Sequence, residues 1–195
     1  MRWLAQMYTT LAPGLVAGVL NMVWCTAPVA HGLARPVDGG RTWRGRRIFG
    51  DNKTWKGVVG MAGLGAACGL VWGGVCAAVP ALHDANLFYT RHTNTPVFST
   101  LVGLAVGLAY AAAELPNSFV KRRLGVAPGK PAPRPWGVVV TVTDQVDSVL
   151  AMVLVVAVLA PMSPGFFAAY VALGGATHAV VNLLLYIVHL RKNPL

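Results

Sequence analysis

Charged side chains are scarce in this sequence. Of its 195 residues, 16 are Lys or Arg and 6 are Asp or Glu, which together make up 11% of the chain, against roughly 25% in an ordinary soluble domain. A soluble domain of this length must cover its surface with polar groups, so the scarcity excludes an ordinary soluble globule. The hydrophobic content of 55% excludes a disordered chain.

Cysteine is also rare, and its pattern excludes two further classes of protein. Cys25, Cys68 and Cys76 are odd in number, lie inside apolar stretches and have no CxxC spacing. The pattern predicts small buried hydrophobic residues, and it indicates neither a disulfide framework nor a zinc site. A nucleic-acid partner is not expected, because short loops on a membrane provide no groove-sized basic surface with stacking aromatics.

The sequence contains long stretches without any charged residue. Four charge-free stretches contain 32, 27, 22 and 43 residues. A bilayer core about 30 Å thick needs roughly 20 apolar helical residues, so the first three hold one span each and the last holds two. The last stretch is divided by a turn at Pro161 to Gly165. We therefore predict an all-α integral membrane protein, a single domain over 1–195, with five spans at 11–33, 57–82, 97–115, 140–160 and 166–190.

The basic residues predict how the chain is oriented. Fourteen of the sixteen fall in the connection after the first span, in the connection after the third span, or at the C-terminus. Short basic loops stay cytoplasmic, so we expect the N-terminus outside, the C-terminus in the cytoplasm and the protein in the cell membrane. Anionic lipid headgroups are one explanation of this charge. A cleaved signal peptide is disfavoured, because Arg2 is its only basic residue and the apolar run is long.

Three of the six acidic residues lie at the edges of predicted spans, where a carboxylate is costly and suggests function. Glu114 ends the third span, and Asp144 and Asp147 lie three residues apart near the start of the fourth. That spacing projects both aspartates from one helix face, where they repel unless a cation lies between them. Oxygen ligands without nearby Cys or His favour Mg²⁺. The alternative is that both aspartates form structural ion pairs with residues 121–123.

Basic residues beside these carboxylates suit phosphoryl-group chemistry at the membrane surface. The first basic loop, residues 34–56, interleaves glycines with Arg and Lys, a combination that suits polyphosphate binding or, alternatively, a lipid-facing loop. No histidine in these basic loops is placed as a general base. None is required, because a phosphate monoester with a second pKa of about 6 is largely ionised at neutral pH.

The run from Glu114 to Gly129, followed by Thr143-Asp-Gln-Val-Asp147, resembles the signature of the CDP-archaeol synthase family. This family comprises CTP:lipid-phosphate cytidylyltransferases related to phosphatidate cytidylyltransferase. The segments 36–40 and 50–57 resemble its loop pattern, and Asn21, His178 and Asn182 match polar positions associated with it. The resemblance covers most of the chain. Archaeal members usually carry Gly-Asp where this chain has Ala113-Glu114, so this carboxylate extends one methylene farther.

The resemblance implies the reaction CTP + lipid phosphate → CDP-lipid + pyrophosphate, at an active site on the cytoplasmic face. The lipid phosphate is either an archaeal-type ether lipid phosphate or phosphatidic acid. Catalytic roles are expected for Asp144, Asp147, Lys121 and Arg122, and Mg²⁺ ligation for Asp144, Asp147 and Glu114. Substrate-binding roles are expected for Asn117, Ser118, Arg123, Lys53, Arg46, Arg47, Asp38 and Thr54.

Several alternatives remain open at this point. A small cation transporter or channel would use intramembrane carboxylates, but it predicts them near the middle of the bilayer on several helices. An enzyme that consumes CDP-lipid would need a denser array of acidic residues. His178 and Asn182, four residues apart on one face, are either buried and hydrogen-bonded or in contact with the site carboxylates. A homodimer is possible.

Overall fold

Five long α-helices make up most of the chain that the computed structural model describes, which is residues 2–128, 130 and 132–189. They are α1 (Arg2–Thr26), α2 (Trp55–Ala78), α4 (Pro96–Arg123), α5 (Gly137–Leu159) and α6 (Pro164–Ile187). Each is long and apolar enough to cross a membrane, which confirms the predicted number of spans. The short elements are η1 (His31–Leu33), β1 (Thr42–Trp43), β2 (Arg46–Arg47) and α3 (Pro80–Ala85).

Local sequence signals set the starts of two of these helices. Proline occupies the first turn of α4 and of α6, where its missing N–H removes no helical hydrogen bond. The preceding Thr95 and Ser163 cap these helices by accepting hydrogen bonds from Phe98 N and Phe166 N at 3.1 and 3.3 Å. The turn expected at Pro161 to Gly165 is confirmed, since α5 ends at Leu159 and α6 begins at Pro164.

The first span was predicted at the wrong position. It was expected at 11–33, but α1 starts at Arg2 and ends at Thr26. The helix stops there because Pro28 disfavours helical geometry in the residue before it. The second span also ends earlier than expected, at Ala78, and Pro80 then starts the separate short helix α3. Part of the connection between the second and third spans is therefore helical.

The third span is longer than predicted, with consequences for the site. It was expected to end at Leu115, yet α4 continues through Pro116 to Arg123. Glu114, Asn117 and Lys121 therefore lie on one helix at spacings of three and four residues, which places them along one face.

Helices α2 and α4 are in close contact. This contact brings α2, which follows the first basic loop, next to α4, which carries Glu114. Gly65 and Gly69 of α2 face Gly103 and Gly107 of α4. A Cβ on Gly103 would lie 2.2 Å from the carbonyl oxygen of Gly65 and 2.9 Å from the Cα of Gly69. Only hydrogen fits there, so the two backbones approach as small residues permit in membranes.

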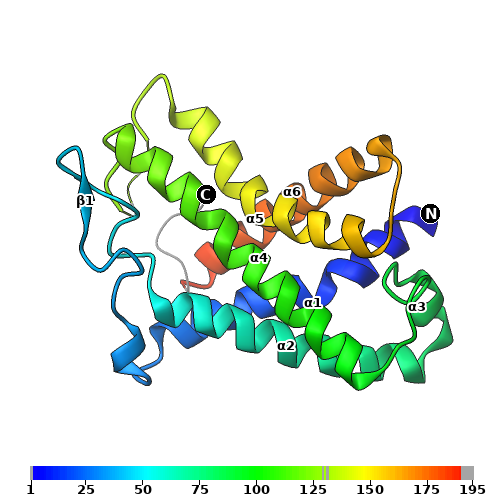
Figure 1. Ribbon diagram of the computed structural model, residues 1–195. Helices are drawn as coiled ribbons and strands as arrows, with labels where there is room; N and C mark the ends of the chain where they lie inside the picture. The colour runs from blue at the N-terminus through cyan, green and yellow to red at the C-terminus, as the bar shows by residue number, and fades with distance from the viewer. Residues whose placement is uncertain (1, 129, 131, 190–195) are drawn as a thin grey trace.

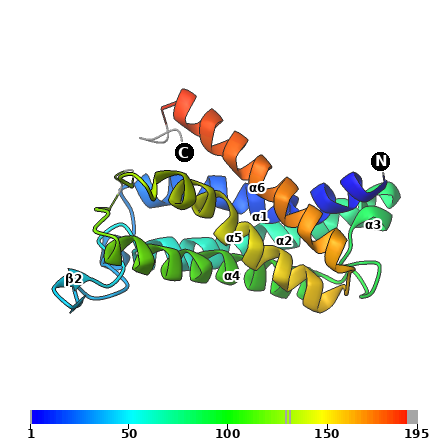
Figure 2. The same ribbon diagram turned by 90° about the horizontal axis from the view of Figure 1, so that it is seen from above.

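The two ends of the helix bundle differ in character. The β1–β2 hairpin and the described part of the α4–α5 connection lie at one end, called here the loop end (residues 27–54, 124–128, 130 and 132–136), while α3 and the start of α1 lie at the other (Figure 1). Seen from above, α6 crosses the bundle obliquely, and its C-terminal half diverges from the other helices (Figure 2). Accordingly Val180, Leu184 and Ile187 are exposed in the isolated chain.

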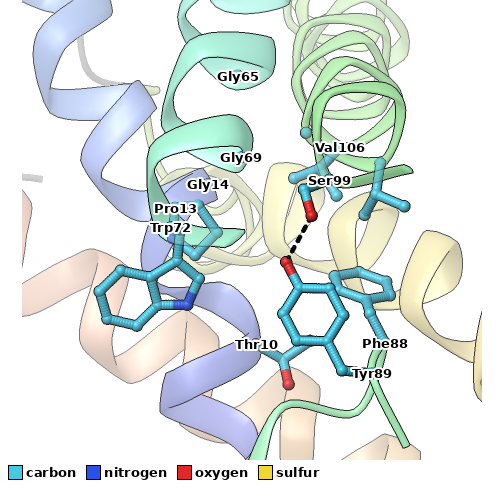
Figure 3. Close-up of a pocket in the computed structure, with 12 residues that line it drawn as sticks. Thr10, Pro13, Gly14, Gly65, Gly69, Trp72, Phe88, Tyr89, Ser99 and Val106 are labelled. Carbon is cyan, nitrogen blue, oxygen red and sulfur yellow. Dashed lines mark hydrogen bonds between the residues drawn. The ribbon is translucent and has the colours of Figure 1, made fainter. Parts of the chain in front are cut away.

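Hydrogen bonds between polar side chains stabilise the packing at the end of the bundle where α3 lies. The Tyr89 and Ser99 hydroxyl oxygens are 2.9 Å apart (Figure 3), and Ser99 Oγ also donates to Asn94 Oδ1 at 2.9 Å. Trp72 Nε1 donates to the Thr9 carbonyl oxygen at 2.8 Å, which ties α2 to α1. The cavity beside these residues has a volume of about 20 Å³. It is large enough for one water molecule and too small for a nucleotide or a lipid headgroup.

Candidate functional site

Two carboxylates converge where α4 packs against α5. The side-chain nitrogen of Asn117 donates to Asp144 Oδ1 and to Asp147 Oδ2, both at 2.6 Å. Lys121 Nζ lies 2.5 and 2.7 Å from the two oxygens of Asp144. The other oxygen of Asp147 accepts from the N–H and the hydroxyl of Ser148. Both aspartates therefore face α4, and the predicted sharing of one helix face is confirmed.

The carboxylate oxygens of this cluster are ligands that suit a hard divalent cation. Two oxygens lie within hydrogen-bond distance of a single nitrogen, so they approach one point closely enough to share a ligand. Mg²⁺ commonly takes one or two carboxylates and completes its shell with water and phosphate oxygens. In the described part of the chain, no group of three His, Cys, Asp or Glu side chains could hold a metal ion. Glu114 as a third ligand therefore stays a prediction.

Glu114 instead pairs with a cation from the first basic loop. Lys53 Nζ donates to Glu114 Oε2, and both side chains are partly exposed. The pair borders a cavity of about 350 Å³ between α1, α2 and α4, whose polar lining includes Asn21, Asn52 and Thr54. Cys25, expected to be buried, is exposed and lines the same cavity. Thr54 also caps α2 by accepting from Gly57 N at 3.2 Å.

The β1–β2 hairpin, which is part of the first basic loop, contacts the C-terminal end of α4. Arg44 and Gly45 both have positive φ, 52° and 73°, which suits the tight turn between the strands. Arg123 donates to the carbonyl oxygens of Trp43, Arg46 and Arg47, the last two at 3.1 and 2.5 Å. Arg46 donates in return to the Arg123 carbonyl oxygen. Both arginines thus hold the loop in place, and their expected contacts with substrate remain predictions.

Asp38 organises the same loop from within. Its side chain is fully buried, and Oδ1 accepts from Arg47 Nη2 at 2.6 Å. The N–H groups of Gly40, Phe49 and Gly50 complete its shell at 3.0 to 3.1 Å. Burial raises the pKa of this carboxyl, but the hydrogen bonds from Arg47 and the three N–H groups outweigh it, so the pKa lies well below its ordinary value. This geometry favours a structural role over the expected substrate contact.

Replacing Asp38 with asparagine should therefore loosen the loop and leave the helices intact. Hydrogen bonds to a charged acceptor contribute about 1.5–3 kcal/mol each, so losing the charge should speed amide exchange at Gly40, Phe49 and Gly50 by at least about tenfold. Hydrogen exchange read by mass spectrometry measures this.

Because the pKa of Asp38 is lowered, its stabilising effect on the loop is complete above the ordinary carboxyl pKa. It is lost progressively as the pH falls from that value to the lowered one, so the loop should stay ordered in mild acid.

The matched control is Asp51→Asn. Asp51 pairs with the same arginine, Arg47, at 2.5 Å, but its side chain is 72% exposed. An exposed pair contributes little, so exchange in the loop should barely change. Equal exchange in the two variants would contradict the assigned role of Asp38.

Arg122 is a buried cation at this end, and it forms no ion pair in the described part of the chain. It is 6% exposed, and its Nε and Nη1 atoms find no hydrogen-bond acceptor within the described ranges. Its Nη1 lies beside Gly50, since a Cβ there would be 3.5 Å from it. A buried guanidinium with open donors is costly unless an anion joins it. Ser118, also expected to bind substrate, is buried on the same stretch of α4.

A polar network behind the aspartates joins three helices. His178 Nδ1 donates to the backbone oxygen of Gln145 at 3.2 Å, and its Nε2 lies 3.3 Å from the Tyr110 hydroxyl. Asn182 donates to Gln145 Oε1 at 2.7 Å. Of the two readings offered for His178 and Asn182, hydrogen bonding in the helix interior is thus the one observed. Gln145 stands between Asp144 and Asp147 in the chain, so the network holds α5 from its opposite side.

Tyr110, Asn52 and Gln145 were not singled out as site candidates by sequence reasoning. Tyr110 lines the 350 Å³ cavity one helical turn before Glu114. A usable signal existed for Gln145, because an uncharged polar residue inside an apolar span between two aspartates is unusual. Asn52 lies within the segment 50–57 that resembles the family's loop pattern, whereas for Tyr110 the sequence has no such signal, because only helix packing places it at the cavity.

The five helices define a multi-pass membrane protein, and the cluster of Asn117, Lys121, Asp144 and Asp147 is its candidate site. A family model described as CarS-like, CDP-archaeol synthase, matches residues 9–195. The CDP-archaeol synthase of Halorubrum lacusprofundi is 30% identical over 174 residues, which cover 86% of this chain and 88% of that protein. The chain belongs to the CarS-like family of CDP-archaeol synthases.

Other matches cover different shares of the chain. The CDP-archaeol synthase of Thermococcus onnurineus is 35% identical over 113 residues, 54% of this chain and 55% of that protein. The chain thus spans about half the length of some relatives that it matches. A solved structure described as an intramembrane enzyme for archaeal membrane lipids biosynthesis matches with a TM-score of 0.54 and 28% identity. That match covers 86% of this chain and 91% of the other.

Proposed function

We propose that this protein is a CTP-dependent cytidylyltransferase that converts a lipid phosphate to CDP-lipid and releases pyrophosphate. Family membership and the match to an intramembrane lipid-biosynthesis enzyme support this proposal. The observation that carries it is the convergence of Asp144 and Asp147 on Asn117 Nδ2, with oxygens 2.6 Å away on each side. Such a pair beside lysine and arginine suits the charge neutralisation that phosphoryl transfer requires.

Mg²⁺ is proposed as the cofactor, held by Asp144 and Asp147, with Glu114 as a further candidate ligand. When bound, such an ion neutralises charge on the triphosphate and polarises the phosphoryl group. Lys121 and Arg122 are proposed to bind phosphate oxygens from α4, and Lys53 from the loop. The open donors of buried Arg122 support this role, because a phosphate would satisfy them.

The reaction needs no general base from the protein. An oxygen of the lipid phosphate attacks the α-phosphorus of CTP, the bond to the β-phosphate breaks, and pyrophosphate leaves with its electron pair. The attacking phosphate is already largely ionised at neutral pH, since its second pKa is about 6. The side chains of the site are therefore proposed to bind and orient the two phosphates and to balance their charge.

The loop end is proposed to face the cytoplasm, where CTP is made. Twelve basic residues of the two loops and the flanking helix turns support this orientation. The remaining two that predict it, Arg191 and Lys192, lie outside the described residues. The lipid substrate would reach the site from the adjoining leaflet. A homodimer remains a proposal that no contact in a single chain addresses.

An acceptor panel tests the function. Purified protein in lipid nanodiscs receives CTP and Mg²⁺ together with an isoprenoid-ether lipid phosphate, phosphatidic acid, or no acceptor. We expect pyrophosphate release and a CDP-lipid of matching mass with at least one acceptor, and none without acceptor. The acceptor with the higher kcat/KM identifies the substrate class.

Absence of CDP-lipid with both acceptors would overturn the proposal. The cation-transporter alternative has its own readout, which is cation flux into liposomes that Asp147→Asn abolishes. The geometry does not favour that alternative, because the carboxylates gather beside lysines near the loop end and leave no row of acids along the bundle in the described residues.

A further inference from the structure

Each proposed phosphate-binding lysine is already paired with a carboxylate. Lys121 contacts both oxygens of Asp144, at 2.5 and 2.7 Å. Lys53 pairs with Glu114, which lies on the same face of α4 about two turns before Lys121. Both pairs therefore join a group expected to bind phosphate to a group expected to bind metal. The two expected roles compete, because one ammonium cannot neutralise a carboxylate and a phosphate fully at once.

A divalent ion bound to Asp144 would be repelled by the Lys121 ammonium group that already lies there. Lys121 occupies hydrogen-bond positions on both oxygens of this carboxylate, and these side chains are only 19% and 25% exposed. In such partly buried surroundings two cations a few ångströms apart repel more than they do in water. A divalent ion that takes an oxygen of Asp144 must therefore displace Lys121 or bind more weakly in its presence.

Both lysines can change partner without moving the backbone. Lysine carries its charge on a flexible four-carbon stem, unlike the planar arginine fork. Lys121 lies in the last turns of α4, and Lys53 immediately precedes Thr54, the N-cap of α2. The cavity of about 350 Å³ beside Lys53 leaves room for its side chain to turn away from Glu114.

We propose that Lys121 and Lys53 are exchangeable counter-ions. Their ammonium groups neutralise Asp144 and Glu114 in the nucleotide-free protein and move to phosphate oxygens when CTP arrives with its divalent ion. This inference rests on the proposed function and goes beyond it. It makes the lysines inhibitors of metal binding without nucleotide, so metal and nucleotide binding are positively coupled.

Divalent-ion binding without nucleotide tests the exchange. Mn²⁺ alone is titrated into protein in nanodiscs and followed by electron paramagnetic resonance, which reports free Mn²⁺. Lys121→Met should bind Mn²⁺ about tenfold more tightly than wild type, because the competing ammonium is gone. Lys121→Arg, which keeps the cation, should stay within about twofold of wild type. Lys53→Met should also raise the affinity and provides a second variant if the first does not fold.

Lys130→Met is the matched control. Lys130 is an exposed residue of the α4–α5 connection, so its removal lowers the net charge by the same amount without opening either ion pair. It should change Mn²⁺ affinity by less than about twofold, because exposed charges are screened. A non-hydrolysable CTP analogue should raise the Mn²⁺ affinity of the wild type, and this gain should shrink in Lys121→Met.

Unchanged or weaker Mn²⁺ binding in both lysine variants would overturn the exchange, as would an equal increase in Lys130→Met. This outcome is separable from failure of the proposed function. If the wild type forms CDP-lipid but its lysine variants do not bind Mn²⁺ more tightly, only the exchange fails. If the wild type makes no CDP-lipid with either acceptor, the function fails, whatever the Mn²⁺ titrations give.

Discussion

Replacing Asp147 with asparagine should lower turnover of CTP and lipid phosphate by at least about 10²-fold. Asparagine keeps the size of the side chain, but it removes one of the two charges that converge on Asn117. Losing a group that stabilises charge in the transition state typically costs two to three orders of magnitude. Asp144→Asn should have a similar effect, because Asp144 supplies the other converging oxygen. Pyrophosphate release with the preferred acceptor measures both variants.

Asp84→Asn is the control for this pair of variants. Asp84 lies on α3 at the opposite end of the bundle, and its side chain is 80% exposed. Its replacement should leave turnover within about twofold of wild type, because exposed charges far from the site are screened. Near-normal turnover in both Asp144→Asn and Asp147→Asn would contradict the proposed site.

Adding one methyl group at Gly103 should disrupt the bundle itself. A Cβ there would lie 2.2 Å from the Gly65 carbonyl oxygen and 2.9 Å from the Gly69 Cα. Both atoms belong to the α2 backbone, which cannot turn aside as a flexible side chain can. We expect Gly103→Ala to lower the free energy of unfolding by about 3 kcal/mol, the upper range for overpacking. Activity should fall with it, because α4 carries Asn117 and Lys121.

Gly63→Ala is the matched substitution on α2. A Cβ at Gly63 would have no described atom within 4 Å, apart from its chain neighbours and its own helix backbone. Alanine there should be neutral or slightly stabilising, because it favours the helix more than glycine does. Reversible unfolding in mixed micelles compares the two variants, and equal stabilities would contradict the close approach of α2 and α4.

The number of spans was predictable, whereas their ends were less so. Charge-free stretches of about 20 or more residues were expected to be helices, because a helix pairs its backbone groups within one segment and this length matches a helical span rather than a strand. The ends depend on finer balances. The third span was expected to end near Leu115, where the charge-free stretch stops at Glu114, yet α4 continues through Pro116 to Arg123. A proline costs one hydrogen bond within a helix, and the packing of α4 against α5 and the hairpin outweighs that loss.

The binding character of the first basic loop was predictable from its composition, but the role of each residue was not. Glycines interleaved with basic residues suggested polyphosphate binding, and roles at the site were expected both for Arg46 and Arg47 of the loop and for Arg122 and Arg123 at the end of α4. Folding separates them, since Arg123 holds the hairpin through three carbonyl oxygens while Arg122, its neighbour, is buried with open donors. Adjacent residues on a helix point about 100° apart, so their surroundings differ completely. No sequence pattern encodes which of them meets the loop.

By itself the sequence determined that this chain crosses a membrane five times and that acidic and basic residues gather on one side. Both follow from the energy of placing charge in hydrocarbon, which depends on residue type and order along the chain. Only the tertiary structure decided that Asn117 meets both aspartates, that Lys121 pairs with Asp144 and that Lys53 pairs with Glu114. Those contacts depend on how α4 and α5 are rotated about their axes, and packing between helices distant in the sequence sets that rotation.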